Sequence, residues 1–343
     1  MLTSASLLDD DGEPFTWAAL SDRIDDSTQP KPWLHLPLSE SDITVAEGEA
    51  AWFPHDWPFL LDVNLTTLID TIFWEEKFAA SAIADELAYY RSILLGLFCS
   101  IPRSVLVSAI DGSLPHKALA KGDDIYPLYN PDPEKEEYEQ HPWFLRRQQK
   151  EGYAIYVRWL VDAAGLSPTP DELMLIVDCL RKYISGEEED AAVAADIDNA
   201  FSPDTSDTDD ILRGQHMHLA GKKRRAAQVH TWCKAIELLC RHLTPTQRTQ
   251  PLSKPRSYCG YSRNVSKRDQ NYRRHQSTTW LVTLVEAVCI VLLPLRSIKL
   301  RTYTVCYLAT KDEVSLAERS LTRCTDSRID AGGFCVAPPG QCR

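Results

Sequence analysis

The first half of the chain carries apolar residues at the spacing of amphipathic helices. From residue 83 they recur every three or four positions, which places them on one helix face: Ile83, Leu87, Tyr90, Leu94 and Leu97. A second amphipathic stretch, residues 143–164, is also predicted to be a helix. The amino-terminal part is therefore predicted to be mainly α-helical.

A third helix has recognisable ends. Thr169 provides an N-cap hydroxyl, Pro170 suits the first turn, and Glu172 can bond back to the cap. Apolar residues follow on one face, and Gly186 is expected to end the helix. No phosphate-binding loop, nucleophile elbow or metal-ligand cluster accompanies these helices, so this half of the sequence indicates no chemistry.

The last third of the chain alternates between strand and helix patterns. A β-like run at 258–262 precedes a basic helix, and an apolar helix to about 293, a β-like run at 303–308 and a helix at 313–322 follow. The apolar segment 280–295 is shorter than the roughly 20 residues of a membrane span, and it has Glu286 in its middle. It is expected to be a buried core helix.

These patterns predict an α+β chain in six parts. They are a loosely structured lead-in (1–55), a mainly α-helical domain (56–186), an acidic disordered linker (187–210), a basic helical connector (211–249), a small α/β domain (250–335) and a tail (336–343). The linker is predicted to be disordered because it has too few large apolar residues to offset the entropy of ordering.

The charge is divided between the two parts of the chain. Residues 1–210 carry 14 Lys and Arg against 41 Asp and Glu, a net −27, whereas residues 211–343 carry 23 against 8, a net +15. A basic segment attracts phosphate polyanions, so contact with nucleic acid, here DNA, is predicted for the second part. The acidic helical half could bind a protein partner, or the two halves could neutralise each other.

The amino terminus and the cysteines favour an intracellular protein, nuclear or cytoplasmic and not secreted. Residues 1–15 lack the basic and apolar regions of a signal peptide, and no membrane contact is expected. None of the ten cysteines forms a Cys-x-x-Cys pair, and most, Cys99 among them, lie in apolar runs. They are expected to be buried, reduced thiols.

One group of residues, between positions 258 and 268, has the spacing of a functional motif. Tyr258 and Gly260 form a Tyr-x-Gly run, Ser262 and Asn264 follow where either can cap the next helix, and Arg268 comes ten positions after the tyrosine. This register resembles the second signature of the GIY-YIG endonucleases, in which Tyr-x-Gly is followed by Ser or Thr, then Asn, then Arg.

The downstream order of elements is also similar to that family, over about residues 250–335. Family members place a metal-binding glutamate in the last helix, followed by a Gly-aromatic turn, and Glu318 and Gly333-Phe334 stand in the corresponding places. The resemblance implies a small α/β domain with a three-stranded antiparallel sheet.

The resemblance also implies roles for individual side chains. Glu318 would hold Mg²⁺ or Mn²⁺, since one carboxylate suffices for an ion that keeps most of its waters. Arg268 would stabilise charge on the phosphate, and Tyr258 would hydrogen-bond to the attacking water or the phosphate. Lys267, Arg273, Arg274 and His275 would bind the nucleic-acid backbone.

The sequence departs from the family pattern at two points. The first motif, Gly-Ile/Val-Tyr, is expected about ten residues before Tyr258, but residues 246–252 contain no tyrosine. The family implicates that tyrosine as the base that activates water, so cleavage is expected to be weakened or lost. The histidine usually found four residues after the arginine is replaced by Tyr272, and His275 comes three residues later.

Three functions remain open from the sequence. They are a metal-dependent DNA endonuclease, a degenerate GIY-YIG-like domain that binds nucleic acid or protein without cutting, and a helical scaffold whose basic part neutralises its acidic part. The overall organisation also resembles uncharacterised filamentous-fungal proteins, some encoded beside secondary-metabolism genes, which implies an accessory role and no particular reaction.

Overall fold

The computed structural model describes residues 56–75, 84–122, 152–201, 216, 218–219, 222–273, 279–310 and 313–336. The helices before the sheet are α2 (Trp57–Val63), α3 (Leu65–Glu75), α4 (Ala84–Cys99), α5 (Arg103–Asp111) and α6 (Leu114–Leu119). Strand β1 (Ala154–Val161) precedes α9 (Pro170–Ser185), α10 (Ala191–Asn199), α11 (Lys223–Arg241) and α12 (Pro245–Arg248). The chain continues with β2 (Ser257–Ser262), α13 (Val265–Arg273), α14 (Trp280–Leu292), β3 (Lys299–Tyr307) and α15 (Glu313–Cys324). All of these elements lie in one compact unit.

The described residues form an α+β fold with one three-stranded antiparallel sheet. The strand order is β2-β1-β3, so β1 is the central strand. Tyr156 lies opposite Gly260 on β2 and opposite Thr304 on β3, and the ladder to β3 shifts register between Ile155 and Tyr156. The sheet therefore joins residues near 155 to residues near 260 and 305.

The central strand corrects one prediction, because 143–164 was expected to be helical and Ala154–Val161 is a strand. Its sequence AIYVRWLV is rich in β-branched and aromatic residues, and all eight residues are buried. A strand buried on both faces loses the alternation of apolar and polar residues that marks a strand, so its pattern can be mistaken for that of a helix.

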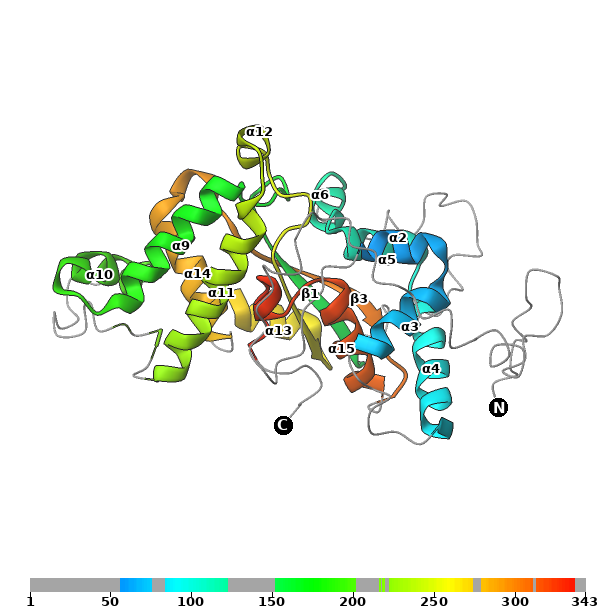
Figure 1. Ribbon diagram of the computed structural model, residues 1–343. Coiled ribbons are helices and arrows are strands. Elements are labelled where there is room, and N and C mark those ends of the chain that lie inside the picture. The colour runs from blue at the N-terminus through cyan, green and yellow to red at the C-terminus, as the bar shows by residue number, and fades with distance from the viewer. Residues whose placement is uncertain are drawn as a thin grey trace. The chain divides into compact units, whose positions relative to one another are not determined.

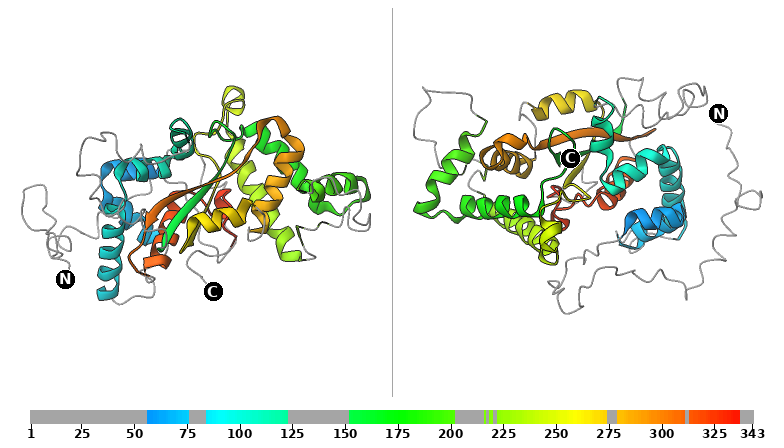
Figure 2. Two further views of the ribbon diagram at one scale, coloured as in Figure 1. Left: turned by 180° about the vertical axis from the view of Figure 1, so that it is seen from behind. Right: turned by 90° about the horizontal axis from the view of Figure 1, so that it is seen from above.

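Helices cover both faces of the sheet (Figures 1 and 2). Ile155, Val157 and Trp159 pack into one core with residues of α2 to α6 and α15. Leu160, on the opposite face, packs into a second core with α9, α10, α11 and α14. The segment between β1 and β2 therefore supplies most of the layer over the second face, and α14 completes it.

This segment corrects a second prediction, since part of the expected disordered linker is ordered. Residues Glu188–Asp190 form a 3-10 helix, and α10 follows directly. Ala194 and Ile197 are fully buried, and the Tyr183 hydroxyl donates a 2.7 Å hydrogen bond to Asp198 Oδ1. A few small apolar residues at helical spacing are thus enough to dock α10. Residues 202–210 lie outside the described part of the chain.

Several other predicted features are confirmed. Thr169 and Glu172 form the capping box of α9, and Gly186 ends that helix in the left-handed conformation. The expected apolar core helix is α14, and it is buried along most of its length, Glu286 included. Among the described helices, none alone is long and apolar enough to cross a membrane, although α4 and α5, bent by 100°, pass a test of length and composition together.

The cysteines follow their prediction with one exception. The nine cysteines in the described part of the chain are free thiols, and most are buried. Cys99 is exposed, because it ends α4 on the side away from the core. Cys342 lies outside the described residues.

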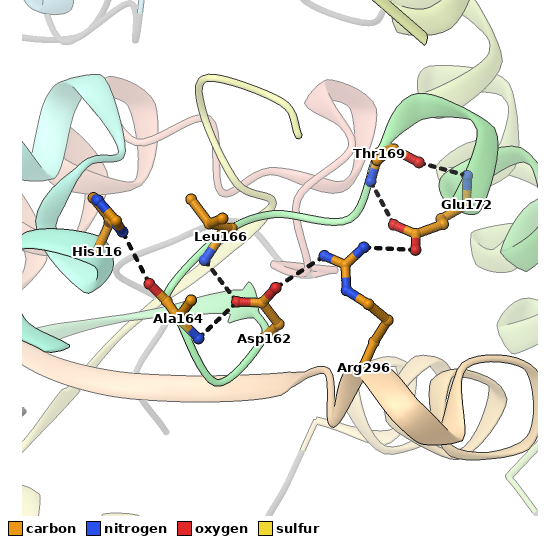
Figure 3. A network of polar contacts seen from close by, with 7 residues as sticks. All are labelled: His116, Asp162, Ala164, Leu166, Thr169, Glu172 and Arg296. Atoms are coloured by element: carbon orange, nitrogen blue, oxygen red, sulfur yellow. Dashed lines mark hydrogen bonds and ion pairs between the residues drawn. The ribbon is translucent and has the colours of Figure 1, made fainter. Parts of the chain in front are cut away.

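An ion-pair network around Arg296 fixes both ends of the connection between β1 and α9 (Figure 3). Its guanidinium donates to Asp162 Oδ2 at 2.9 Å and to Glu172 Oε1 at 2.7 Å. Asp162 Oδ1 also accepts from the backbone of Ala164 and Leu166, and Glu172 Oε2 accepts from the backbone of Thr169. The same side chain therefore joins the end of β1, the start of α9 and the turn before β3.

We predict that Arg296→Ala lowers the free energy of unfolding by about 1.5–3 kcal/mol, the range for hydrogen bonds to charged groups. Arg181→Ala is the matched control, because Arg181 forms a more exposed pair with Glu237 and should contribute below about 1 kcal/mol. Urea unfolding of both variants measures the difference. Equal losses would contradict the role assigned to Arg296.

Candidate functional site

The strand-turn-helix segment β2–α13 has the local structure that its sequence predicts. Ser262 Oγ accepts the backbone N–H of Asn264 at 3.1 Å, and Asn264 Oδ1 accepts that of Lys267 at 2.8 Å. Asn264 is therefore the N-cap of α13. The helix begins three residues after the strand ends, and it returns over the second face of the sheet.

Four side chains meet on that face, and we call Tyr156, Tyr258, Arg268 and Tyr272 the tyrosine–arginine cluster. The hydroxyls of Tyr156 and Tyr272 lie 2.6 Å apart and are hydrogen-bonded. Arg268 donates from Nε to the Tyr272 hydroxyl at 3.2 Å, and the ring centroids of Tyr156 and Tyr258 lie 6.4 Å apart. Three elements, β1, β2 and α13, supply the cluster.

Steric contacts explain why the Tyr-x-Gly run has a glycine at position 260. A Cβ atom at Gly260 would lie 2.8 Å from the Tyr156 hydroxyl oxygen and 2.9 Å from a ring carbon of Tyr258. Both contacts are shorter than van der Waals distance. Because Gly260 has no side chain, the Tyr156 phenol can lie against the backbone of β2 at this position.

Burial and charge set the protonation of the cluster. Desolvation by burial, reinforced by the neighbouring tyrosines, raises the pKa of Tyr156 well above its ordinary value. Burial raises the pKa of Tyr258 as well, with further contributions from Tyr272, Cys335 and Glu318. Burial acts to lower the pKa of Arg268, but Tyr272 and Tyr156 outweigh it and raise the pKa. Tyr156 and Tyr258 are therefore neutral phenols, and Arg268 is a charged guanidinium, at neutral pH.

A buried ion pair lies beneath the cluster. Arg158, 3% exposed on β1, has its guanidinium 4.1 Å from the centroid of the Tyr272 ring. Its Nη2 lies 3.9 Å from Glu286 Oε1, which also accepts the backbone N–H of Leu300 at 2.7 Å. Glu286 thus has a backbone donor and a cation, as a carboxylate in an apolar helix requires.

The predicted metal ligand, Glu318, lies in α15, which covers the face of the sheet opposite the tyrosine–arginine cluster. Helix α15 packs against the opposite face of β2, where Cys259 Sγ lies 3.9 Å from the Glu318 backbone oxygen. The Glu318 carboxylate still acts on the cluster, because it helps to raise the pKa of Tyr258. The described residues contain no group of three or more His, Cys, Asp and Glu placed to hold a metal ion. A cation at Glu318 would depend on water and phosphate oxygens for its other ligands.

The predicted nucleic-acid ligands are distributed along α13. Lys267 and Arg273 are exposed, and Arg273 pairs with Asp269 at 2.8 Å. Arg274 and His275 lie outside the described residues. The structure therefore brings Tyr258 and Arg268 into one cluster and leaves two cations of the same helix at the surface.

The segment expected to hold the first family motif is not a strand. Residues 245–248 form the short helix α12, capped by Thr244. The strand beside β2 is β1, which carries Tyr156. Sequence reasoning missed Tyr156 and Arg158 because it treated this run as helical and searched next to Tyr258. The run of β-branched and aromatic residues after Tyr153 was the available signal.

Comparisons of the chain with protein-family models, with curated proteins and with solved structures found no match.

We predict opposite effects for two Gly→Ala substitutions. Gly260→Ala should lower the free energy of unfolding by about 1–3 kcal/mol, because the new methyl group displaces a buried phenol. Gly96→Ala, inside α4 with no atom within 4 Å of the new Cβ, should raise it by about 0.5–1 kcal/mol. Denaturant unfolding measures both values, and a Gly260→Ala variant as stable as the wild type would contradict the packing of Tyr156.

Proposed function

We propose that the tyrosine–arginine cluster is the phosphate-binding centre of a GIY-YIG-like nucleic-acid-binding protein. The observation that carries the proposal is the hydrogen-bonded chain from Tyr156 through Tyr272 to Arg268. It holds a partly exposed, permanently charged guanidinium in a fixed orientation, which favours a phosphate oxygen as ligand.

The order of elements supports the family part of the proposal. A strand with Ile155-Tyr156 pairs antiparallel with the strand of Tyr258 and Gly260, and a capped helix with Arg268 follows. After it come an apolar helix, a third strand and a helix with Glu318, the succession that the resemblance implies. Residues 162–256, with α9 to α12, would then be an insertion between the first two strands.

The distribution of charge supports the choice of ligand. Lys267 and Arg273 are exposed on the helix that carries Arg268, and residues 211–343 have a net charge of +15. When a phosphate backbone binds to such a surface, its condensed counterions are released into the solvent, which gives affinity without sequence preference. A helical scaffold that binds only protein would need no charged guanidinium above a set of buried phenols.

Divalent-metal-dependent DNA cleavage is a second candidate, and the position of Tyr156 favours it. This tyrosine would supply the side chain that is missing from residues 246–252. Glu318 is a hard oxygen ligand of the kind that Mg²⁺ and Mn²⁺ prefer. Because α15 packs on the face of the sheet opposite the cluster, an ion at Glu318 would have to reach the phosphate around the edge strand β2, where it would polarise the phosphate. The raised pKa of Tyr156 keeps its phenol protonated at neutral pH, so this residue would donate a hydrogen bond instead of removing a proton. Cleavage, if present, is therefore slow.

We predict that the wild-type protein binds a short DNA duplex with an affinity that falls steeply with salt. Arg268→Ala combined with Arg273→Ala should weaken binding and lower the slope of log K against log salt by up to about 0.9 for each lost phosphate contact. The control is Arg181→Ala, an exposed arginine of α9 far along the chain from the cluster. Fluorescence anisotropy over a salt series measures the slopes, and no binding at low salt would rule out the proposal.

The cleavage candidate has its own test. Supercoiled plasmid should be nicked slowly with Mg²⁺ or Mn²⁺, and Glu318→Gln should abolish nicking without loss of DNA binding. Glu188→Gln, an exposed carboxylate on the 3-10 helix after α9, is the control and should leave nicking unchanged. Nicking that persists in Glu318→Gln would show that this residue is not the metal ligand. If the wild-type protein does not nick the plasmid, the cleavage candidate is excluded and only the proposal of DNA binding stands.

A further inference from the structure

A small pocket lies between the last turn of α13 and the edge strand β3. Asp269 and Arg273 line it from the helix, and residues 299–303 line it from the strand. Its volume is about 110 Å³, well below the roughly 300 Å³ of the smallest pockets that enclose a drug-sized ligand. The pocket therefore suits a group of a few heavy atoms and excludes a whole nucleoside.

The charges around the pocket favour an anion. Arg273, Lys299 and Arg301 contribute three cations, and Asp269 contributes the single carboxylate. That carboxylate already accepts from Arg273 Nε at 2.8 Å, so its charge is largely compensated. Lys299 is exposed and forms no ion pair with any residue that the structure describes. Lys299 therefore adds a positive charge to the pocket lining that no described carboxylate compensates.

Polar atoms beside the pocket also lack partners. Thr302 lines the pocket, and its buried Oγ1 has no hydrogen-bond partner among the described residues. Thr302 lies opposite Arg158 in the sheet, and Arg158 is 97% buried. The Nε and Nη1 atoms of Arg158 also have no hydrogen-bond partner among the described residues. Unpartnered buried donors are costly, so a ligand oxygen near Thr302 would relieve part of that cost.

The pocket lies next to residues that contact the tyrosine–arginine cluster. Leu300 lines it, and the Leu300 backbone oxygen accepts from Arg158 at 3.4 Å, directly below Tyr272. Arg268 and Arg273 are five residues apart on α13, roughly 7.5 Å along the helix axis.

We propose that this pocket binds a second phosphate of the nucleic-acid strand whose first phosphate Arg268 holds. The assignment rests on the proposed function, and it adds Lys299 and Thr302 to the interface. Lys299 neutralises the phosphate, and the Thr302 hydroxyl donates to one of its oxygens. The pocket fixes the register of the strand across the cluster and reads no base.

Lys299→Gln tests the pocket, because Lys299 is exposed and its loss should leave the fold intact. Lys182→Gln, which removes an exposed lysine at the end of α9, controls for the change in total charge. Anisotropy of a labelled DNA duplex over a salt series should give a slope lower by about 0.9 for Lys299→Gln. The slope for Lys182→Gln should equal that of the wild type.

The outcomes separate the pocket from the function on which it rests. If the wild type binds DNA and both lysine variants give its slope, the pocket assignment is wrong and the proposed function stands. If the wild type does not bind DNA at low salt, both fail. A second arm measures thermal unfolding with inorganic phosphate. Stabilisation of wild type but not of Lys299→Gln, with equal DNA slopes, would show a site for free phosphate and overturn the assignment to a nucleic-acid strand.

Discussion

The fold depends on covering one strand, β1, on both faces and both edges. All eight of its residues are buried, and it is hydrogen-bonded to β2 and to β3. Helices α2 to α6, which precede it, cover one face together with α15. Helices α9, α10, α11 and α14, three of which lie between β1 and β2, cover the other. The long connection between the first two strands is therefore a structural layer of the sheet.

The second face of β1 differs from an ordinary core because it carries Tyr156 and Arg158. A buried hydroxyl and a buried guanidinium are costly unless they are paired. Tyr272, from α13, contacts both of them, and Glu286, from α14, approaches the arginine. These contacts tie α13 to the sheet and orient Arg268. The polar cluster is thus both a packing requirement of the fold and the basis of the proposed phosphate site.

Local signals in the sequence predicted much of this fold. The capping box of α9, the cap at Asn264 and the apolar helix α14 were all recognisable because each depends on neighbouring residues. The prediction of a helix at the central strand was wrong, because a strand buried on both faces has no alternating pattern. Helix α10 was missed because its docking depends on contacts with other helices. The cluster could be predicted only in part. The Tyr156–Tyr272 hydrogen bond joins residues 116 positions apart, and no local pattern reports such a contact.

The proposed phosphate site requires Tyr156 and Arg268 to act together on one phosphate, although distant segments supply them. A double-mutant cycle tests this requirement, with DNA affinity measured for Tyr156→Phe, Arg268→Gln and the double variant. Because Tyr272 links the two side chains, we expect effects that are not additive, with a coupling above about 0.5 kcal/mol. Additive effects, or no effect of Tyr156→Phe, would contradict it.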